Sequence, residues 1–198
     1  KNFYCKNIDQ FSLCDETEII FIAVGTPSKE NGDIDLSYIF SSFEIIGKAI
    51  SKRKTFKHYS IVVKSTVIPG TTLNHGKEII EKYSGLSFEK SEFGLGMNPE
   101  FLREGSAILD AFNPDRIVIG TEDNLTKERM RKLYSNFDSE KYFCNTATAE
   151  FSKYANNIFL ALQISMSNEL ANIASKINEV KIKQALEIIK LDSRWKNT

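Results

Sequence analysis

The chain has 198 residues, enough for one large or two small domains with a buried core. Its 26 basic and 26 acidic residues balance, which argues against nucleic acid or an anionic membrane surface as a partner. The longest apolar run, residues 19–24, is too short to span a bilayer, and no signal-peptide pattern opens the sequence. Cys5, Cys14 and Cys144 lack metal-ligand spacing and fit free thiols in a reducing compartment, so we expect a soluble cytoplasmic protein.

The first half of the chain alternates apolar runs with helical patterns. Residues 18–24 are rich in β-branched side chains, which is typical of a strand buried in a parallel sheet. Gly-Thr-Pro at 25–27 ends this strand, and a helix over 35–50 follows a polar loop, with Asp35 as its cap. We expect a second buried strand over 60–64 and a helix over 71–83, capped by Thr71 or Thr72.

A weaker strand over 93–97 leads into the segment NPEFLREG. Its asparagine and proline predict a helix over 98–109, with Asn98 as the N-cap. Glu100 and Glu104 would then lie on one helical face. On spacing alone, such a pair is more often a solvated acidic turn than part of a ligand site.

The pattern continues with a strand over 116–120, a helix within 121–137 and a short strand over 142–144. Strands that alternate with helices predict a doubly wound α/β domain with a parallel (Rossmann) sheet. We expect two domains, residues 1–147 and residues 148–198.

The second domain begins with a long helix. Residues 149–178 contain neither proline nor glycine and predict a helix of about 45 Å. Between residues 154 and 166 this helix is apolar nearly all round, so we expect burial by a second layer or a partner subunit. A last helix is expected over 182–190.

Three segments are candidates for a ligand site because ligands of doubly wound sheets bind beyond the carboxyl ends of the strands. These segments are 24–28, 64–67 and 98–104, and they supply small residues, hydroxyls and carboxylates. An ordinary strand-to-loop exit is the alternative for Gly-Thr-Pro. The dinucleotide fingerprint G-x-G-x-x-G is absent, since Gly94-Leu95-Gly96 lacks its third glycine.

Lys153 and Asn157 lie four residues apart on the long helix, so they share a face. Directed at a reacting oxygen, they would stabilise a developing negative charge. The alternative is a lysine that reaches water beside a structural asparagine. His58 and His75 have no metal-ligand spacing, and we expect both at the surface.

Four long stretches of the chain resemble, in the same order, the UDP-glucose/GDP-mannose dehydrogenase family. They read FIAVGTPSKENGDIDLSYI, KSTVIPGTT, NPEFLREGSAILDAFNPDRIVIG and AEFSKYANNIFLALQISMSNELANIA. The resemblance implies an NAD-dependent enzyme that oxidises the 6-hydroxyl of a nucleotide sugar to a carboxylate, for polysaccharide precursor synthesis. In that family a cysteine captures the aldehyde, a second oxidation gives a thioester, and water hydrolyses it. UDP-glucose is the implied substrate, with GDP-mannose as the near alternative.

The resemblance also implies roles for individual residues. Glu100 matches the base for the hydrolytic water, Lys153 and Asn157 match the oxyanion donors, and Thr66 matches a residue near that water and the nicotinamide. The implied cofactor-binding residues are Val24, Gly25, Thr26, Pro27, Ser28, Ser65, Thr66, Val67 and Glu104. The implied substrate-binding residues are Glu100, Phe101, Leu102, Arg103, Glu104, Lys153 and Asn157.

Two expected parts of the family pattern do not occur in these 198 residues. They are the first βαβ unit with its glycine fingerprint and a glycine-rich segment with the catalytic cysteine. The chain therefore reads as an internal piece, incapable alone of a full turnover. The resemblance implies a homodimer through the helix 148–178; a non-catalytic dimerising remnant and a β-hydroxyacid dehydrogenase are the alternatives.

Overall fold

The computed structural model describes residues 13, 16–54 and 56–195, so Cys5 and Cys14 lie outside the described residues. The chain divides into two compact units, Lys1–Tyr154 and Ala155–Thr198. Within the described residues, no helix combines the length and the apolar character needed to cross a bilayer.

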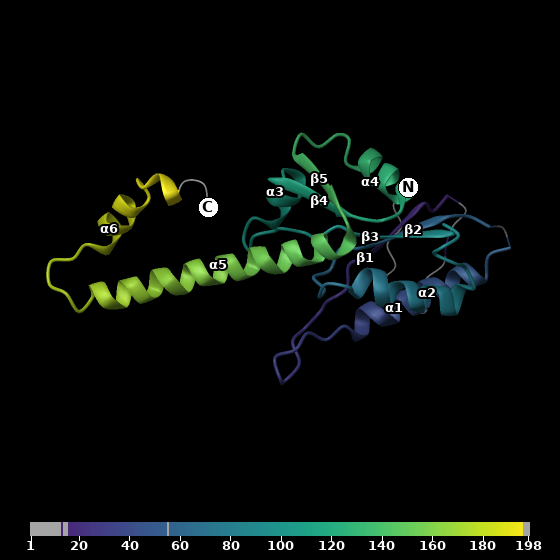
Figure 1. The fold of residues 1–198 in the computed structure, drawn as a ribbon, viewed down its shortest axis with the longest axis horizontal. Helices are drawn as coiled ribbons and strands as arrows, with labels where there is room; N and C mark the ends of the chain where they lie inside the picture. Colours follow the sequence, from purple (N-terminus) through teal and green to yellow (C-terminus); the bar gives the residue numbers. More distant parts are fainter. Residues whose placement is uncertain (1–12, 14–15, 55, 196–198) are drawn as a thin grey trace. The chain divides into compact units, whose positions relative to one another are not determined.

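The first unit is built on a five-stranded sheet (Figure 1). Its strands lie in sequence order: β1 (Ile19–Ile22), β2 (Tyr59–Val63), β3 (Phe93–Met97), β4 (Arg116–Gly120) and β5 (Glu140–Cys144). Adjacent strands are parallel except β3 and β4, which pair antiparallel through Met97 and Gly120. The α/β class is confirmed, but the sheet is mixed rather than wholly parallel. The connection from β3 to β4 contains only the short helix α3 (Ala107–Phe112), whereas a parallel crossover usually uses a longer helix.

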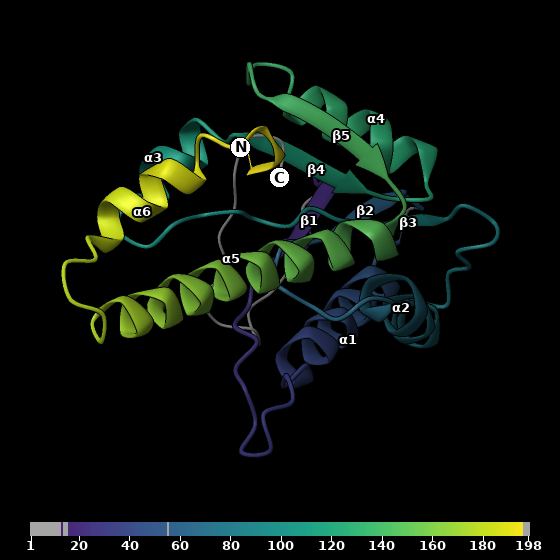
Figure 2. The same ribbon diagram turned by 60° about the vertical axis from the view of Figure 1, so that its left-hand side comes forward.

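Helices cover both faces of this sheet. Helices α1 (Ser37–Ser51) and α2 (Gly76–Ser84) lie together on one face, and α4 (Asn124–Leu133) lies on the other (Figures 1 and 2). Strand β2 is buried at every position, because Ile61 and Val63 join the core under α1 and α2 while Val62 joins the core under α4. The buried strand predicted over 60–64 is confirmed by β2, whereas the strand predicted as buried over 18–24 leaves Phe21 of β1 38% exposed. Strand β3, predicted only as a weaker strand, is buried at every position.

The predicted helix over 98–109 is wrong. Residues 98–106 form loop and turn, and regular helix begins only at Ala107. The Asn98 side chain is buried and does not cap a helix, since its Nδ2 donates to the carbonyl of Val118 (2.8 Å). Gly105, at φ +85°, takes the left-handed conformation that ends a turn. Glu100 and Glu104 therefore do not share a helical face.

The long helix α5 (Thr146–Ala174) begins in the first unit and continues through the second. Its 29 residues correspond to about 44 Å, close to the expected length. In the second unit, α5 is followed by α6 (Ile182–Ile189) and the short 3-10 helix η3 (Ser193–Trp195). Among the residues that the structure describes, none buries the middle of α5, where Phe159 and Leu162 are 69% and 61% exposed.

Candidate functional site

The carboxyl ends of β1 and β2 bring two of the expected segments side by side. The Ser65 hydroxyl donates to the carbonyl of Val24 (2.6 Å), which ties residues 65–67 to residues 24–28. Thr66 is half-buried and Val67 fully buried. At Gly25 the backbone is open, because a Cβ placed there would meet no atom within 4 Å. The pair of segments thus presents accessible backbone beside a half-buried hydroxyl.

An ion pair between a buried lysine and a half-buried glutamate lies beyond the end of β3. Lys153 Nζ lies 3.1 Å from Glu100 Oε1, and the two side chains are 8% and 32% exposed. The other carboxylate oxygen, Oε2, accepts a hydrogen bond from the backbone N–H of Leu102 (2.7 Å). A lysine so deeply buried is costly unless it is paired, so Glu100 accounts for its position.

The Phe101 ring is flanked by two cations. The Arg116 guanidinium lies 3.9 Å from the ring centroid, and Lys153 Nζ lies 5.4 Å from it. Both distances are within the range of cation–π attraction. Phe101 therefore connects the start of β4 and the first turns of α5 to the loop that carries Glu100.

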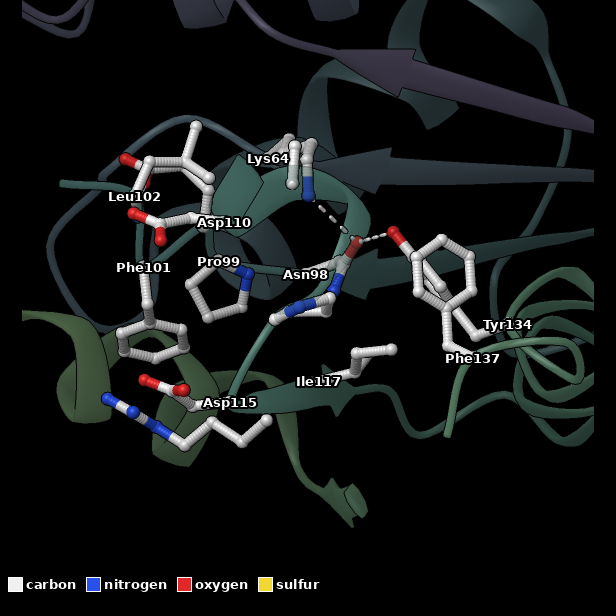
Figure 3. A pocket seen from close by; sticks show the side chains of 14 residues that line it. Lys64, Asn98, Pro99, Phe101, Leu102, Asp110, Asp115, Ile117, Tyr134 and Phe137 are labelled. Atoms are coloured by element: carbon white, nitrogen blue, oxygen red, sulfur yellow. Dashed lines mark hydrogen bonds between the residues drawn. The ribbon is translucent and has the colours of Figure 1, made fainter. Parts of the chain in front are cut away.

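A second lysine, Lys64, faces the same loop. Its Nζ donates to Asn98 Oδ1 (3.2 Å), which also accepts from the Tyr134 hydroxyl (2.5 Å), as Figure 3 shows. Burial lowers the pKa of Lys64; Glu100 acts in the opposite direction and Lys153 in the same direction. The charges of Lys64, Glu100 and Lys153 are thus close enough to influence one another.

A cavity of about 290 Å³ opens beside this cluster (Figure 3). One part of its lining is polar and charged, and another part is apolar or aromatic, from the loop after β3, from β4 and from the turn after α4. The lining includes Lys64, Asn98, Glu100, Phe101, Asp115 and Tyr134. Its mixture of charged and aromatic groups suits a polar ligand with a flat or ring-shaped part.

The lining of the cavity includes neither Arg103 nor Glu104. The Arg103 side chain is paired with Asp110, which also accepts from the Arg103 backbone N–H (2.9 Å). The Arg103 hydrogen bonds hold the pKa of the Asp110 carboxyl well below its usual range. Glu104 is exposed in the turn, and Asn157 is exposed on α5 in the second unit.

Sequence reasoning missed Glu150, a fully buried carboxylate on α5. Its Oε2 accepts from the backbone N–H of Gly70 (2.5 Å), and its Oε1 accepts from that of Thr72 (2.8 Å). The available signal was its position three residues before Lys153, on nearly the same side of the helix.

The surface position expected for His58 is also wrong. Its ring is 10% exposed, with Nε2 3.4 Å from Asp123 Oδ2 and Nδ1 3.0 Å from Arg129 Nη1. His75 is exposed, as expected, and packs against Phe40. Among the described residues, no group of three or more metal-ligating side chains could hold a metal ion.

Sequence models of the UDP-glucose/GDP-mannose dehydrogenase family match two parts of the chain. The NAD binding domain of the family matches residues 4–138, and its central domain matches residues 147–198. The UDP-glucose 6-dehydrogenase of Rickettsia bellii is 41% identical over 181 residues, which are 90% of this chain and 39% of that protein.

Two solved structures extend the similarity to the fold. The GDP-mannose dehydrogenase of Pseudomonas aeruginosa gives a TM-score of 0.84 at 37% identity, covering 91% of this chain and 41% of that one. A UDP-glucose dehydrogenase of Pyrobaculum islandicum gives 0.82 at 39% identity, covering 90% and 40%. The chain thus spans about 40% of the length of the relatives it matches. Because both family models match and together extend over most of its length, the chain belongs to the UDP-glucose/GDP-mannose dehydrogenase family.

Proposed function

We propose that the protein carrying this chain is an NAD-dependent nucleotide-sugar 6-dehydrogenase. Residues 1–147 would contribute to cofactor binding, and residues 148–198 would begin the substrate and dimerisation region. The observation that carries the proposal is the ion pair between Glu100 and the buried Lys153, beside a cavity at the ends of the parallel strands. Paired charges at such a place are typical of a reaction site.

Residues 24–28 and 65–67 fit a dinucleotide. The open backbone at Gly25 lets a flat group approach closely, and Thr66 lies between the buried Val67 and the anchored Ser65. Exposed Glu104 would contact the cofactor from the loop after β3. When bound, NAD would accept a hydride from the substrate carbon in each oxidation. The residues of this chain would orient the cofactor and exclude water from its reactive end.

Glu100, Lys153 and Asn157 would serve the hydrolytic step. Glu100 would take a proton from water as the water oxygen attacks the thioester carbon, and the carbon–sulfur bond would then break with release of the thiolate. The ammonium of Lys153 and the amide of Asn157, one helical turn apart, would donate to the developing oxyanion. Thr66 would lie near this water. Residues 101–103 would form the wall of the sugar-nucleotide site.

UDP-glucose is the substrate that we propose first, because NPEFLREG followed by PDRIVIG is most similar to the UDP-glucose branch. GDP-mannose is the second candidate, since relatives of both kinds match the chain. The test is NADH formation by the protein expressed from its complete coding sequence, with UDP-glucose, GDP-mannose and their N-acetyl relatives as substrates. Absence of NADH formation with all of them would overturn the proposed activity.

We also propose a homodimer through the helix predicted over 148–178. Large apolar side chains on this helix are exposed in the second unit, including Ile158, Phe159, Leu162 and Ile164. Contiguous apolar surface of this kind marks a protein interface. A dimeric protein that formed no NADH would favour the dimerising remnant over the enzyme.

A further inference from the structure

Glu150 joins two segments that are distant in sequence. Its carboxylate is fully buried on the second turn of α5, and both of its oxygens accept from backbone N–H groups of residues 70–72. Burial and the neighbouring Glu122 raise the pKa of Glu150, against the opposing effect of its hydrogen bonds to Thr72 and Gly70. Burial of a carboxylate costs desolvation free energy, so we expect its two hydrogen bonds to serve a specific role in the structure.

This role is explained by the backbone of residues 70–72, which Glu150 contacts. Gly70, at φ +92°, is the N-cap of the short π-helix η2 (Thr71–His75), which continues into α2. Because glycine has no side chain, Gly70 cannot cap the helix that follows it. Glu150 supplies the missing acceptor from α5. The negative charge also lies at the electropositive end of that helix.

Glu150 thereby fixes one end of the segment that carries Thr66. The other end is fixed by the Ser65 hydroxyl on the carbonyl of Val24. Between these anchors, Val67 is buried, while Ile68 and Pro69 are exposed. The position of Thr66 therefore depends on both anchors.

The same part of α5 also contacts the loop after β3. Lys153, three residues after Glu150, forms the ion pair with Glu100. The first turns of α5 thus bind both loops of the candidate site, one through each side chain. We propose that Glu150 is a positioning residue that sets the Thr66 segment relative to the Glu100–Lys153 pair, a role that rests on the proposed function.

The first test measures hydrogen–deuterium exchange by NMR on the 198-residue chain. In Glu150→Gln, the amides of Gly70 and Thr72 should exchange about tenfold faster, because one acceptor is replaced by a donor. Core amides such as that of Val63 should be unaffected. Glu128→Gln is the matched control, because the exposed Glu128 side chain pairs with Arg131 on α4. Unchanged exchange rates at the amides of Gly70 and Thr72 would overturn the proposal that Glu150 anchors this segment.

The second test measures kinetics on the protein expressed from its complete coding sequence. Glu150→Gln should lower kcat about 10-fold to 100-fold with little change in KM for the nucleotide sugar, because misplacement of a reacting group reduces rate more than binding. Glu150→Asp keeps the charge on a shorter side chain and should give a kcat between those of wild type and Glu150→Gln. If the glutamine variant does not fold, the aspartate variant provides the test. An unchanged kcat in an active variant would overturn the positioning role alone. A wild-type protein without NADH formation would overturn the proposed function and this role with it.

Discussion

Lys153 Nζ lies 3.1 Å from Glu100 Oε1, and this contact joins the first turns of α5 to the loop after β3. The two residues are far apart in sequence, and Glu100 lies in a loop rather than on the helix predicted there. Lys153 is buried, whereas about a third of the Glu100 side chain remains exposed. The pair therefore combines a fixed cation with a carboxylate that water can reach.

This ion pair should be measurable as a coupling energy. A double-mutant cycle with Lys153→Met and Glu100→Gln should give about 1 to 2 kcal/mol in the free energy of unfolding, since one partner is buried. The exposed pair of Glu44 and Lys48 is the control and should give a clearly smaller coupling energy, because solvent screens it. Urea denaturation of the 198-residue chain provides these values. Equal coupling energies for the two pairs would contradict the claim that burial of Lys153 strengthens its interaction with Glu100.

Glu100→Gln should slow hydrolysis in the protein expressed from its complete coding sequence. An amide cannot take the proton of the attacking water, so we expect a loss of about 10²-fold to 10⁴-fold in steady-state rate. A covalent adduct should then accumulate and be visible by intact-protein mass spectrometry. Glu128→Gln, at an exposed position on α4, is the control. Wild-type turnover in Glu100→Gln would remove Glu100 from the role of base.

Asp123 should make stability depend on pH. Burial raises its pKa, but the nearby His58 ring and the hydrogen bond from the Thr126 N–H outweigh this effect and lower the pKa to about 2, below the ordinary value of 3.8. The ionised carboxylate therefore stabilises the fold above pH 3.8, and this contribution is lost as the pH falls from 3.8 to about 2.

The variant Asp123→Asn isolates this contribution. At pH 7 it should lower the free energy of unfolding by about 1 to 2 kcal/mol, a value reduced for solvent screening. The difference from wild type in urea denaturation should shrink by about half at pH 3. A difference that stays constant between the two pH values would show that the ionised form is not the stabilising species.

The exposed apolar face of α5 predicts self-association. Sedimentation of the 198-residue chain at micromolar concentration should show a dimer, and Phe159→Glu with Leu162→Glu should produce a monomer, because buried unpaired charges oppose association. Lys52→Glu, an exposed change in the first unit, should leave the dimer intact. A wild-type monomer would count against the helix-mediated interface.

The strands were the most predictable elements. Strands β3 and β4 have the predicted bounds, and β1 and β2 differ from prediction by one or two residues at each end. In β1, β2 and β4, runs of β-branched residues between turn residues leave few alternatives. The direction of β4 was not predictable, because an apolar strand can pair in either sense. The prediction of a helix beginning at residue 98 was wrong because of a tertiary contact. Asparagine is a typical N-cap residue, but the side-chain amide of Asn98 donates to the carbonyl of Val118 and accepts from Lys64.

The candidate site was predictable in part. The proximity of residues 24–28 and 65–67 followed from the rule that parallel strands end at one edge. The partners of Lys153 and Glu150 could not be predicted from the sequence. A helical pattern shows which residues share a face, but it does not show which loop meets that face. The burial of His58 likewise depends on Asp123 and Arg129, which follow it by more than sixty residues.

The stoichiometry of the reaction tests the central claim most directly. Purified protein from the complete coding sequence should form two NADH for each nucleotide sugar consumed, measured by absorbance together with chromatography of the acidic product. This result is expected because a 6-hydroxyl reaches the carboxylate level by two successive two-electron oxidations. One NADH per sugar, or none with UDP-glucose, GDP-mannose or their N-acetyl relatives, would contradict the assignment.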